Sequence, residues 1–420
     1  MAEIKVEALV DFQTVHMDMV GDIYEYQGKI IRVINRRFTK HSRKLLEKGG
    51  LIEKLVKNKL FVDTWVSDLQ CPDADIILQH KKVEPQQHYS QWSFEMMKDA
   101  ALLVLKINEI CSQYGYELKD CHQGNIMFDG IRPVWVDFGS FVKKQKKERW
   151  IIQKEFIKCY YLPLLLWSKG YDGVVNSLFN SSLSVDLEEL ISINYHIPRK
   201  FCDKVVKIIE TYLELEKLSN NIKPLCMKSK TLWGDYQDGY WERNNARFDY
   251  EINWINQHCK DINSMVEIGA NQGMFSYLVA QRTNVKKIIA TDCDQVAIDI
   301  MYKKLKSERI EKILPGILDF VWSPCEILRN YQSDLVVANA LTHHLLLSQG
   351  MTMKAMLEKF SILTSKFIIV EFMPKGVNKA HLPKWYTKDW FLQSLREKFE
   401  IVEVNENWAG RIIIIGKKKK

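Results

Sequence analysis

From about residue 262 onward, short apolar runs alternate with helical segments, and this rhythm constrains the fold more than any other feature. The apolar runs predict strands at residues 264–268, 287–291, 313–318, 335–338, 367–372, 399–404 and 412–415. Strands that alternate with helices predict a mostly parallel sheet covered by helices on both faces. We therefore expect a doubly wound, Rossmann-like α/β sheet in the C-terminal part of the chain.

The first of these strands runs into a glycine-containing turn, MVEIGANQGMFSYLVAQ, at residues 265–281. Glu267, Gly269 and Gly273 form an E-x-G-x-x-x-G pattern, in which glycine permits a sharp turn and a close approach of the following helix to a ligand. The phosphate-binding pattern G-x-G-x-x-G is absent from this turn. The longer loop with a preceding acid, including Asn271, instead resembles the turn with which methyltransferases hold the amino-acid tail of S-adenosylmethionine (SAM).

Polar and aromatic residues follow the next two strands at positions that suit the rest of this cofactor. Asp292 ends the second strand, where a carboxylate can accept hydrogen bonds from both ribose hydroxyls. Asp319 follows the third strand and is expected to accept from the adenine amino group, with Phe320 packed on the ring. The order of these signals favours a SAM site over a Rossmann-like sheet without a cofactor.

The fourth strand leads into Asn339, His343 and His344, at the sheet edge where ligands collect in open α/β folds. A histidine can act as general base because its imidazole titrates near pH 6.5, so either histidine is a candidate; the alternative is that the pair only shapes the pocket. Asn339 is expected to orient the methionine tail or the acceptor. Glu371, at the end of the fifth strand, is a second candidate base, or else a structural carboxylate.

An aromatic and charged stretch, WGDYQDGYWERNNARFDY, precedes the sheet at residues 233–250. It predicts a cap over the cofactor, with Tyr236, Tyr240 and Arg243 near the SAM carboxylate. The alternative is an aromatic helix packed on the sheet.

The N-terminal part contains LKDCHQGNIMFDGIRPVWVDFGSF at residues 118–141, which is similar to the active-site core of kinases. Asp120, Asn125 and Asp137 match the catalytic aspartate and the two magnesium ligands in order. Arg32 is the best match for the phosphate-anchoring lysine, although arginine is no simple substitute for it, and no G-x-G-x-x-G cover is present. No metal is expected unless this site is active, in which case Asn125 and Asp137 would bind it.

The surrounding pattern predicts an α+β kinase-like domain: a hairpin at 20–35, a helix at 93–114, and a helical extension over 150–218. Three interpretations remain open: a kinase-derived scaffold that presents the acceptor, an active phosphotransferase, or a coincidental pattern on an unrelated domain. We favour the scaffold. The expected domains are 1–149 (kinase-like), 150–230 (helical extension or linker) and 231–420 (methyltransferase).

Residues 231–416 resemble class I SAM-dependent methyltransferases, and the longer chain resembles the bacterial nodulation-protein-like methyltransferases. The matching positions are Leu118-Lys119-Asp120, Asn125, residues 132–137, Ser140-Phe141, Trp150, Gln153, Phe156, Trp233, Asp235-Tyr236, His343-His344-Leu345, Glu371-Phe372 and Pro374-Lys375. The resemblance implies SAM as cofactor and O-methylation of a sugar or cell-surface glycan precursor in polysaccharide biosynthesis. The alternatives are a small-metabolite methyltransferase, a bifunctional kinase–methyltransferase, a kinase with a regulatory SAM-binding domain, and a nonenzymatic SAM sensor.

Composition limits the partners and the compartment. The net charge of +8 owes half its value to Lys417–Lys420, expected to be a solvated tail, with weak contact to an anionic membrane surface as the alternative. The sequence has no stripe of basic and aromatic residues that would predict nucleic-acid binding. The nine cysteines form no CxxC pair, no signal peptide is visible, and the longest apolar run has eight residues, so a cytoplasmic protein is expected. A homodimer is compatible with the sequence.

Overall fold

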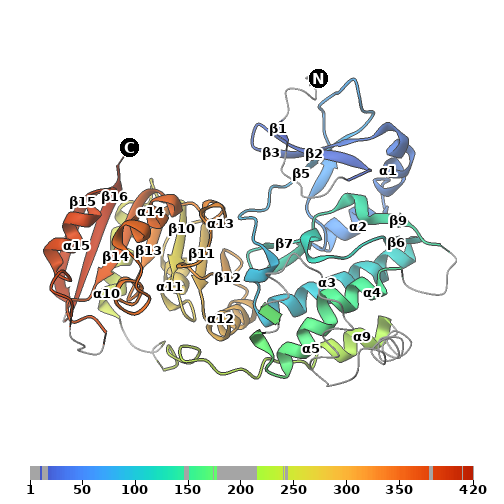
Figure 1. Ribbon diagram of the computed structural model, residues 1–420. Coiled ribbons are helices and arrows are strands. Elements are labelled where there is room, and N and C mark those ends of the chain that lie inside the picture. Colours follow the sequence, from blue (N-terminus) through green and yellow to red (C-terminus); the bar gives the residue numbers. More distant parts are fainter. Residues whose placement is uncertain are drawn as a thin grey trace. The chain divides into compact units, whose positions relative to one another are not determined.

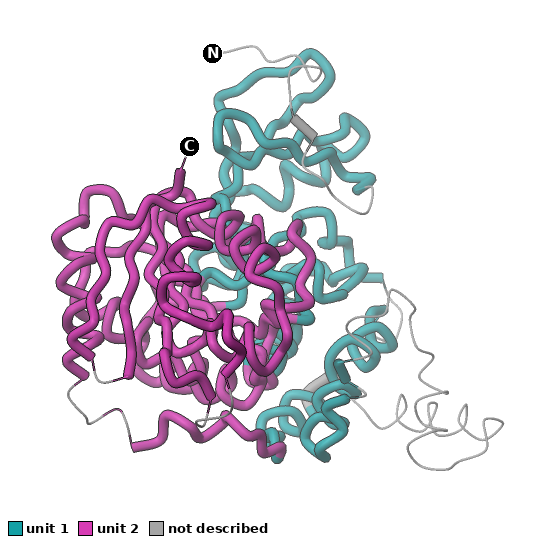
Figure 2. The backbone as a smooth tube through the Cα atoms, turned by 60° about the vertical axis from the view of Figure 1, so that its left-hand side comes forward, with its two compact units in different colours: residues 1–90, 96–129, 133–228 teal, residues 91–95, 130–132, 229–420 magenta. Residues whose placement is uncertain are grey.

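The computed structural model describes residues 10–11, 18–145, 151–173, 175–176, 215–239, 241, 245–377, 382–408 and 410–419. The chain divides into two compact units (Figure 2). The first comprises residues 1–90, 96–129 and 133–228, and the second comprises residues 91–95, 130–132 and 229–420. Among the described residues, no helix is long and apolar enough to cross a membrane.

The second unit is built on a seven-stranded sheet (Figure 1). Its strands are β10 (Ser264–Ile268), β11 (Lys287–Asp292), β12 (Ile313–Ile317), β13 (Ser333–Ala338), β14 (Thr364–Phe372), β15 (Phe399–Trp408) and β16 (Arg411–Lys418). The order across the sheet is β12-β11-β10-β13-β14-β16-β15. Strands β10 to β14 are parallel, and β16 runs antiparallel between β14 and β15. The expected mostly parallel, Rossmann-like sheet is confirmed, with the direction of connection reversing between β10 and β13.

Helices cover both faces of this sheet (Figure 1). One face packs against α10 (Ala246–Gln257), α11 (Met274–Arg282) and α12 (Gln295–Glu308), and the other against α13 (Cys325–Arg329), α14 (Met353–Leu363) and α15 (Lys388–Leu395). Strand β14 shows why both faces are apolar. Phe367 and Ile369 enter the first core, whereas Ile368 and Val370 enter the second, as the two-residue period of a strand requires.

The first unit has an α+β fold with a five-stranded sheet in the order β1-β2-β3-β5-β4. These strands are β1 (Val10–Asp11), β2 (Gly21–Tyr26), β3 (Lys29–Ile34), β4 (Thr64–Val66) and β5 (Ile77–His80). The predicted hairpin is confirmed as β2–β3. Its two-residue turn places Gln27 at φ 49° and Gly28 at φ 74°, the left-handed geometry that joins twisted strands best.

Helices and short strand pairs complete this unit. The helices are α1 (Thr39–Leu45), α2 (Leu51–Lys57), α3 (Phe94–Gln113), α4 (Gln153–Phe156), α5 (Leu162–Ser168) and α9 (Leu215–Ile222). Strand β6 (Tyr116–Leu118) pairs with β9 (Phe141–Lys143), and β7 (Ile126–Asp129) pairs with β8 (Arg132–Trp135). The helix expected at 93–114 is therefore confirmed, while much of the stretch 150–218 lies outside the described residues.

The side chain of Lys417 is exposed, as expected of a solvated lysine, whereas that of Lys418 is half-buried and departs from the expectation. Lys417 and Lys418 belong to β16, which pairs with both β14 and β15 up to these residues. The Nζ of Lys418 donates to the carbonyl oxygens of Ser361 (2.6 Å) and Thr364 (2.9 Å). The strand therefore extends beyond the apolar run at 412–415, because β14 and β15 continue to pair with it.

Candidate active site

The glycine turn joins β10 to α11 at the carboxyl edge of the sheet. Gly269 and Gly273 have φ values of 73° and 78°, in the region that favours glycine. A Cβ on Gly269 would lie 3.1 Å from the side chain of Leu341, which follows β13. The turn after β10 and the loop after β13 therefore lie in contact.

Buried hydrogen bonds hold this turn. The Oε2 of Glu267, in the interior, accepts from the backbone N–H (3.1 Å) and hydroxyl (2.5 Å) of Ser276 on α11. Burial raises the pKa of Glu267 to about 7. The carboxylate of Asp292 accepts from the N–H groups of Asn271 (2.8 Å) and Asp294 (2.9 Å), so it links the ends of β10 and β11.

The segment 231–239 lies over the turn and is attached to it by amide side chains and by the carboxylate of Asp238, which accepts from Gln272 Nε2 (2.7 Å). Asn271 Nδ2 donates to the carbonyl of Trp233 (2.6 Å), and Gln272 Nε2 donates to that of Gly234 (2.8 Å). Gln237 donates to the Ala270 carbonyl (3.3 Å) and accepts from the Met274 N–H (3.2 Å).

The Trp233 ring also contacts the ring of His344, with centroids 5.4 Å apart. One residue of the segment thus reaches both the turn after β10 and the loop after β13. Tyr236 is 48% exposed, while Tyr240 and Arg243 lie outside the described residues.

The two residues predicted to hold adenine occupy different environments after β12. Asp319 is exposed, and its Oδ1 accepts from the N–H groups of Val321 (2.9 Å) and Trp322 (3.1 Å). Phe320 is 4% exposed and stacks on Phe360 of α14, with ring centroids 4.9 Å apart. Phe320 thus packs into the core beneath α14.

Beyond β13, the structure brings together the predicted polar residues. Asn339 and His343 are buried, and both carry a buried atom without a hydrogen-bond partner, Oδ1 and Nδ1 respectively. Burial, together with His344 and Arg411, lowers the pKa of His343 to about 3. Burial also lowers the pKa of the half-buried His344. Both imidazoles are therefore neutral at pH 7.

Glu371 is fully buried, and its side chain is occupied by three donors. Oε1 accepts from Arg247 of α10, while Oε2 accepts from Arg411 (2.8 Å) and from the N–H of Ala340 (2.7 Å). Ala340 has a φ of 51°, which is uncommon for a residue with a side chain. Glu371 therefore fixes the backbone directly after Asn339.

A further acid, Glu251 of α10, lies beside this group and was not predicted from the sequence. Its Oε2 accepts from Asn339 Nδ2 (2.8 Å), and its buried Oε1 has no partner. Burial raises the pKa of Glu251 to about 8, opposed by Arg247. A sequence signal was available: Arg247 and Glu251 stand four residues apart among the buried Phe248, Ile252 and Ile255 of an amphipathic helix.

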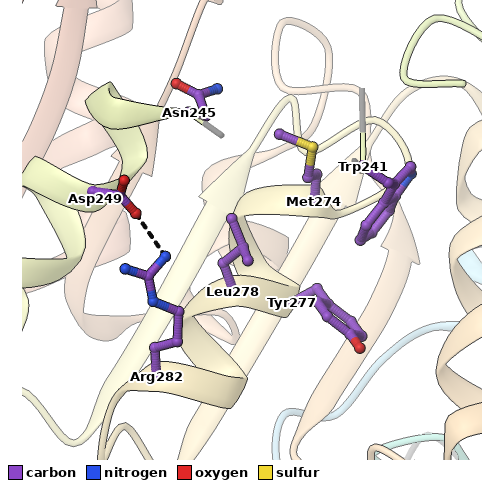
Figure 3. A pocket seen from close by; sticks show the side chains of 7 residues that line it. All are labelled: Trp241, Asn245, Asp249, Met274, Tyr277, Leu278 and Arg282. Atoms are coloured by element: carbon purple, nitrogen blue, oxygen red, sulfur yellow. Dashed lines mark hydrogen bonds and ion pairs between the residues drawn. The ribbon is translucent and has the colours of Figure 1, made fainter. Parts of the chain in front are cut away.

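A small pocket of about 140 Å³ lies against α10 and α11 (Figure 3). It is lined by Trp241, Asn245, Asp249, Met274, Tyr277, Leu278 and Arg282, none of them a predicted site residue. Asp249 and Arg282 form an ion pair across it, with Oδ1 and Nη1 2.7 Å apart (Figure 3).

In the first unit, the predicted kinase-like residues form a separate polar cluster. Arg32 on β3 is 1% exposed and pairs with Asp18 and with Asp137, the latter at 3.2 Å. Burial alone would raise the pKa of Asp137, but Arg32 and hydrogen bonds from Ser140 and Gly139 hold it below its usual value.

The other predicted residues join the same cluster. Asp120 Oδ1 accepts from Asn125 Nδ2 (2.8 Å) and from the Ser140 hydroxyl (2.7 Å). Among the described residues, no group of three or more His, Cys, Asp or Glu side chains is arranged to hold a metal ion.

Comparison with known proteins agrees with the geometry of the second unit. Residues 250–388 match the family model of ribosomal protein L11 methyltransferase (PrmA). They include the glycine turn, α10 from residue 250 onward, and strands β10 to β14. With the Rossmann-like sheet, this match makes the chain a SAM-dependent methyltransferase.

Among individual proteins, the chain is 23% identical to the nodulation protein NoeA of Rhizobium meliloti (strain 1021), over 92% of this chain and 91% of that protein. The solved structures include magnesium protoporphyrin IX methyltransferase of Synechocystis PCC 6803 with bound S-adenosylhomocysteine (SAH; 12% identity, TM-score 0.34, 51% of this chain and 99% of that one). They also include a SAM-dependent methyltransferase of Clostridium acetobutylicum ATCC 824 (9% identity, TM-score 0.35, 44% and 96%).

Proposed function

We propose that this methyltransferase modifies a hydroxyl group of a sugar or cell-surface glycan precursor. The observation that carries the proposal is a set of buried polar atoms without partners. They are Asn339 Oδ1 and His343 Nδ1, which follow β13, and Glu251 Oε1 on α10. Buried polar atoms are normally paired, and a hydroxyl-rich substrate supplies both donors and acceptors for them. The resemblance to nodulation-protein-like methyltransferases implies a glycan and not the alternative, a small metabolite, and the distant relative is named a nodulation protein.

The glycine turn and the strand ends around it provide a fitting site for SAM. The residues that we assign to it are Glu267, Gly269, Asn271, Gly273, Asp292, Asp319, Phe320, Asn339, Tyr236 and Arg243. Asn271 supports this fit, because its buried Oδ1 lacks a partner within the turn. The bound cofactor supplies an activated methyl group, and the protein must orient the acceptor and remove its proton.

For catalysis we retain His343, His344 and Glu371 as candidates with different prospects. A histidine whose pKa is about 3 is a weak proton acceptor at neutral pH. His344 is less buried and remains the better base of the two. Glu371 has no unoccupied oxygen, which supports a positioning role.

For the first unit, we propose a kinase-like scaffold in residues 1–149, followed by a helical extension at 150–230 and the methyltransferase at 231–420. A bifunctional kinase–methyltransferase is the second candidate, favoured by the ion pair of Arg32 with Asp137 and by the hydrogen bond from Asn125 to Asp120. We place the enzyme in the cytoplasm, where cysteines stay reduced; all eight cysteines in the described part of the chain are free.

Paired calorimetric titrations test both candidates. The full-length protein is titrated with SAH and, separately, with a nonhydrolysable Mg²⁺·ATP analogue. Binding of SAH alone supports a methyltransferase on a scaffold, whereas binding of both supports the bifunctional enzyme. If SAH does not bind, the assignment of the glycine turn is wrong.

The acceptor is tested by transfer of radiolabelled methyl groups from SAM to a panel of nucleotide sugars, oligosaccharides and small hydroxylated metabolites. We expect label in the sugar fractions that survives mild base, as a methyl ether does and a methyl ester does not. Label confined to small metabolites would support the alternative substrate class.

A further inference from the structure

Glu251 is a buried carboxyl group with an incomplete set of hydrogen bonds. Its side chain is fully buried on α10, one oxygen accepts from Asn339, and the other has no partner. A buried polar atom without a partner is costly to the fold. Asn339 repeats the pattern, because its Oδ1 is also buried and unpaired. The two side chains hold each other and leave one oxygen each for a ligand.

This pair lies next to the glycine turn. Asn339 follows β13, which pairs in parallel with β10 so that Val337 lies beside Glu267. The carboxyl ends of both strands therefore adjoin, at the point where the direction of connection reverses. The contact expected between a Cβ at Gly269 and the Leu341 side chain brings the two loops together.

Two of the other candidate bases nearby, Glu371 and His343, are less suited to take a proton. Both oxygens of Glu371 on β14 are occupied by arginines and a backbone N–H. His343 has an imidazole of lowered basicity. The charged groups that act on Glu251 are Arg247 on its own helix, Glu371, and Glu267 on β10. With a pKa of about 8, Glu251 is mostly protonated at pH 7, and its ionised form, which is the form that accepts a proton, is a stronger base than an ordinary carboxylate.

We propose that Glu251 is a catalytic residue that faces the methyl-transfer position and accepts the proton of the substrate hydroxyl through its unpaired Oε1. The hydroxyl oxygen forms its bond to the methyl carbon, the electron pair of the broken bond remains on sulfur, and the hydroxyl proton passes to Glu251. Asn339 positions the carboxylate through its hydrogen bond to Oε2. This inference rests on the proposed function, since it names the base for the same hydroxyl acceptor.

The test uses two cofactor analogues and needs no acceptor. Sinefungin carries a protonated amine on the carbon that replaces the methylsulfonium, whereas SAH carries nothing at that place. A carboxylate facing the methyl position therefore binds sinefungin preferentially and loses its own proton in doing so. By calorimetry on the full-length protein, we expect sinefungin to bind about tenfold or more tightly than SAH, with proton release detected in buffers of different ionisation enthalpy.

The variant Glu251→Gln keeps the shape and the bond from Asn339 but cannot carry the charge. It should lose most of the preference for sinefungin and the proton release, while its affinity for SAH stays within about twofold of the wild type. Asp249→Asn, on the same helix, is the matched control and should behave as the wild type. Glu251→Asp, which keeps the carboxyl group, is the second variant if the glutamine variant does not fold, and should retain part of the preference.

The outcomes distinguish a failure of this inference from a failure of the proposed function. If wild-type protein binds SAH but the preference for sinefungin survives in Glu251→Gln, Glu251 does not face the methyl position. An equal loss of both ligands would place Glu251 at the shared methionine tail and would also overturn the inference. Failure of the wild-type protein to bind SAH would overturn the proposed function itself.

Discussion

Replacing Glu251 by glutamine should change how the stability of the protein depends on pH. In the folded protein burial holds the pKa of Glu251 at about 8, against an ordinary value of 4.5. Below pH 4.5 the carboxyl group is protonated in both the folded and the unfolded state, so its titration does not lower the free energy of unfolding. As pH rises towards 8, the unfolded chain releases the proton first, so the free energy of unfolding falls. Glutamine carries no such proton and removes this loss.

The size of the effect follows from the two pKa values. Each pKa unit corresponds to about 1.4 kcal/mol, so integration from pH 5 to pH 9 gives a relative gain of roughly 4 kcal/mol for the glutamine variant. For a unit of about 200 residues, this corresponds to roughly 8 to 16 °C in melting temperature. Other groups also titrate, with Glu267 acting in the same direction and His343 in the opposite one. The difference between variant and wild type cancels the contributions of groups that do not interact with Glu251, and retains the coupling of Glu251 to Glu267 and Glu371.

The measurement is a set of thermal unfolding curves of full-length wild type, Glu251→Gln and Asp249→Asn at half-unit steps from pH 5 to pH 9. The variant's melting temperature should rise steadily relative to the wild type, whereas the Asp249→Asn curve should run parallel to it, because that ion pair is on the surface. Parallel curves for Glu251→Gln and wild type would refute the reasoning, since the carboxyl group would then be ionised at low pH or exposed.

Three further substitutions test other contacts. Gly273→Ala places a Cβ about 2.7 Å from the sulfur of Met301 at a left-handed φ. We expect the protein to lose about 1–2 kcal/mol of stability and to bind SAH more weakly, as measured by calorimetry. Unchanged SAH binding would count against the turn as the cofactor site. Glu371→Gln leaves two arginines without their counter-charge and should lower the free energy of unfolding by about 3–5 kcal/mol. The midpoint of urea unfolding should therefore fall, and an unchanged midpoint would contradict the prediction. Asp137→Asn removes one of two carboxylates that neutralise the buried Arg32. It should destabilise the first unit by about 2 kcal/mol, whereas the affinity for SAH should stay the same. A loss of SAH affinity would show that the two sites are coupled.

The strands of the second unit could be predicted because their own residues determine them. Residues 264–268 form a strand with the predicted bounds, and 287–291 lengthens by one residue. Both are apolar runs buried on two faces, and this sequence pattern is typical of strands in a parallel sheet. Strand β15 extends four residues beyond the predicted end, to Trp408, through the polar stretch Asn405–Asn407. Its pairing with β16 continues there, which local composition does not show.

The site was less predictable because its partners are distant in sequence. Glu371 was expected as a base or a structural carboxylate, but the arginines that occupy it come from positions 247 and 411. Glu251 meets Asn339 across 88 residues. No local pattern reports such pairings, and the same holds for Asp18 beside Arg32 in the first unit.

The hydrogen bonds that attach residues 231–239 to the glycine turn offer a way to detect cofactor binding. Three of these hydrogen bonds join uncharged groups, so salt screens them little. Gln272 also donates to the carboxylate of Asp238 (2.7 Å). Any molecule that orders the turn must also slow the opening of the segment. Amide hydrogen exchange in peptides from residues 231–239 should therefore slow when SAM or SAH binds, which gives a readout of cofactor occupancy that works before the acceptor is identified.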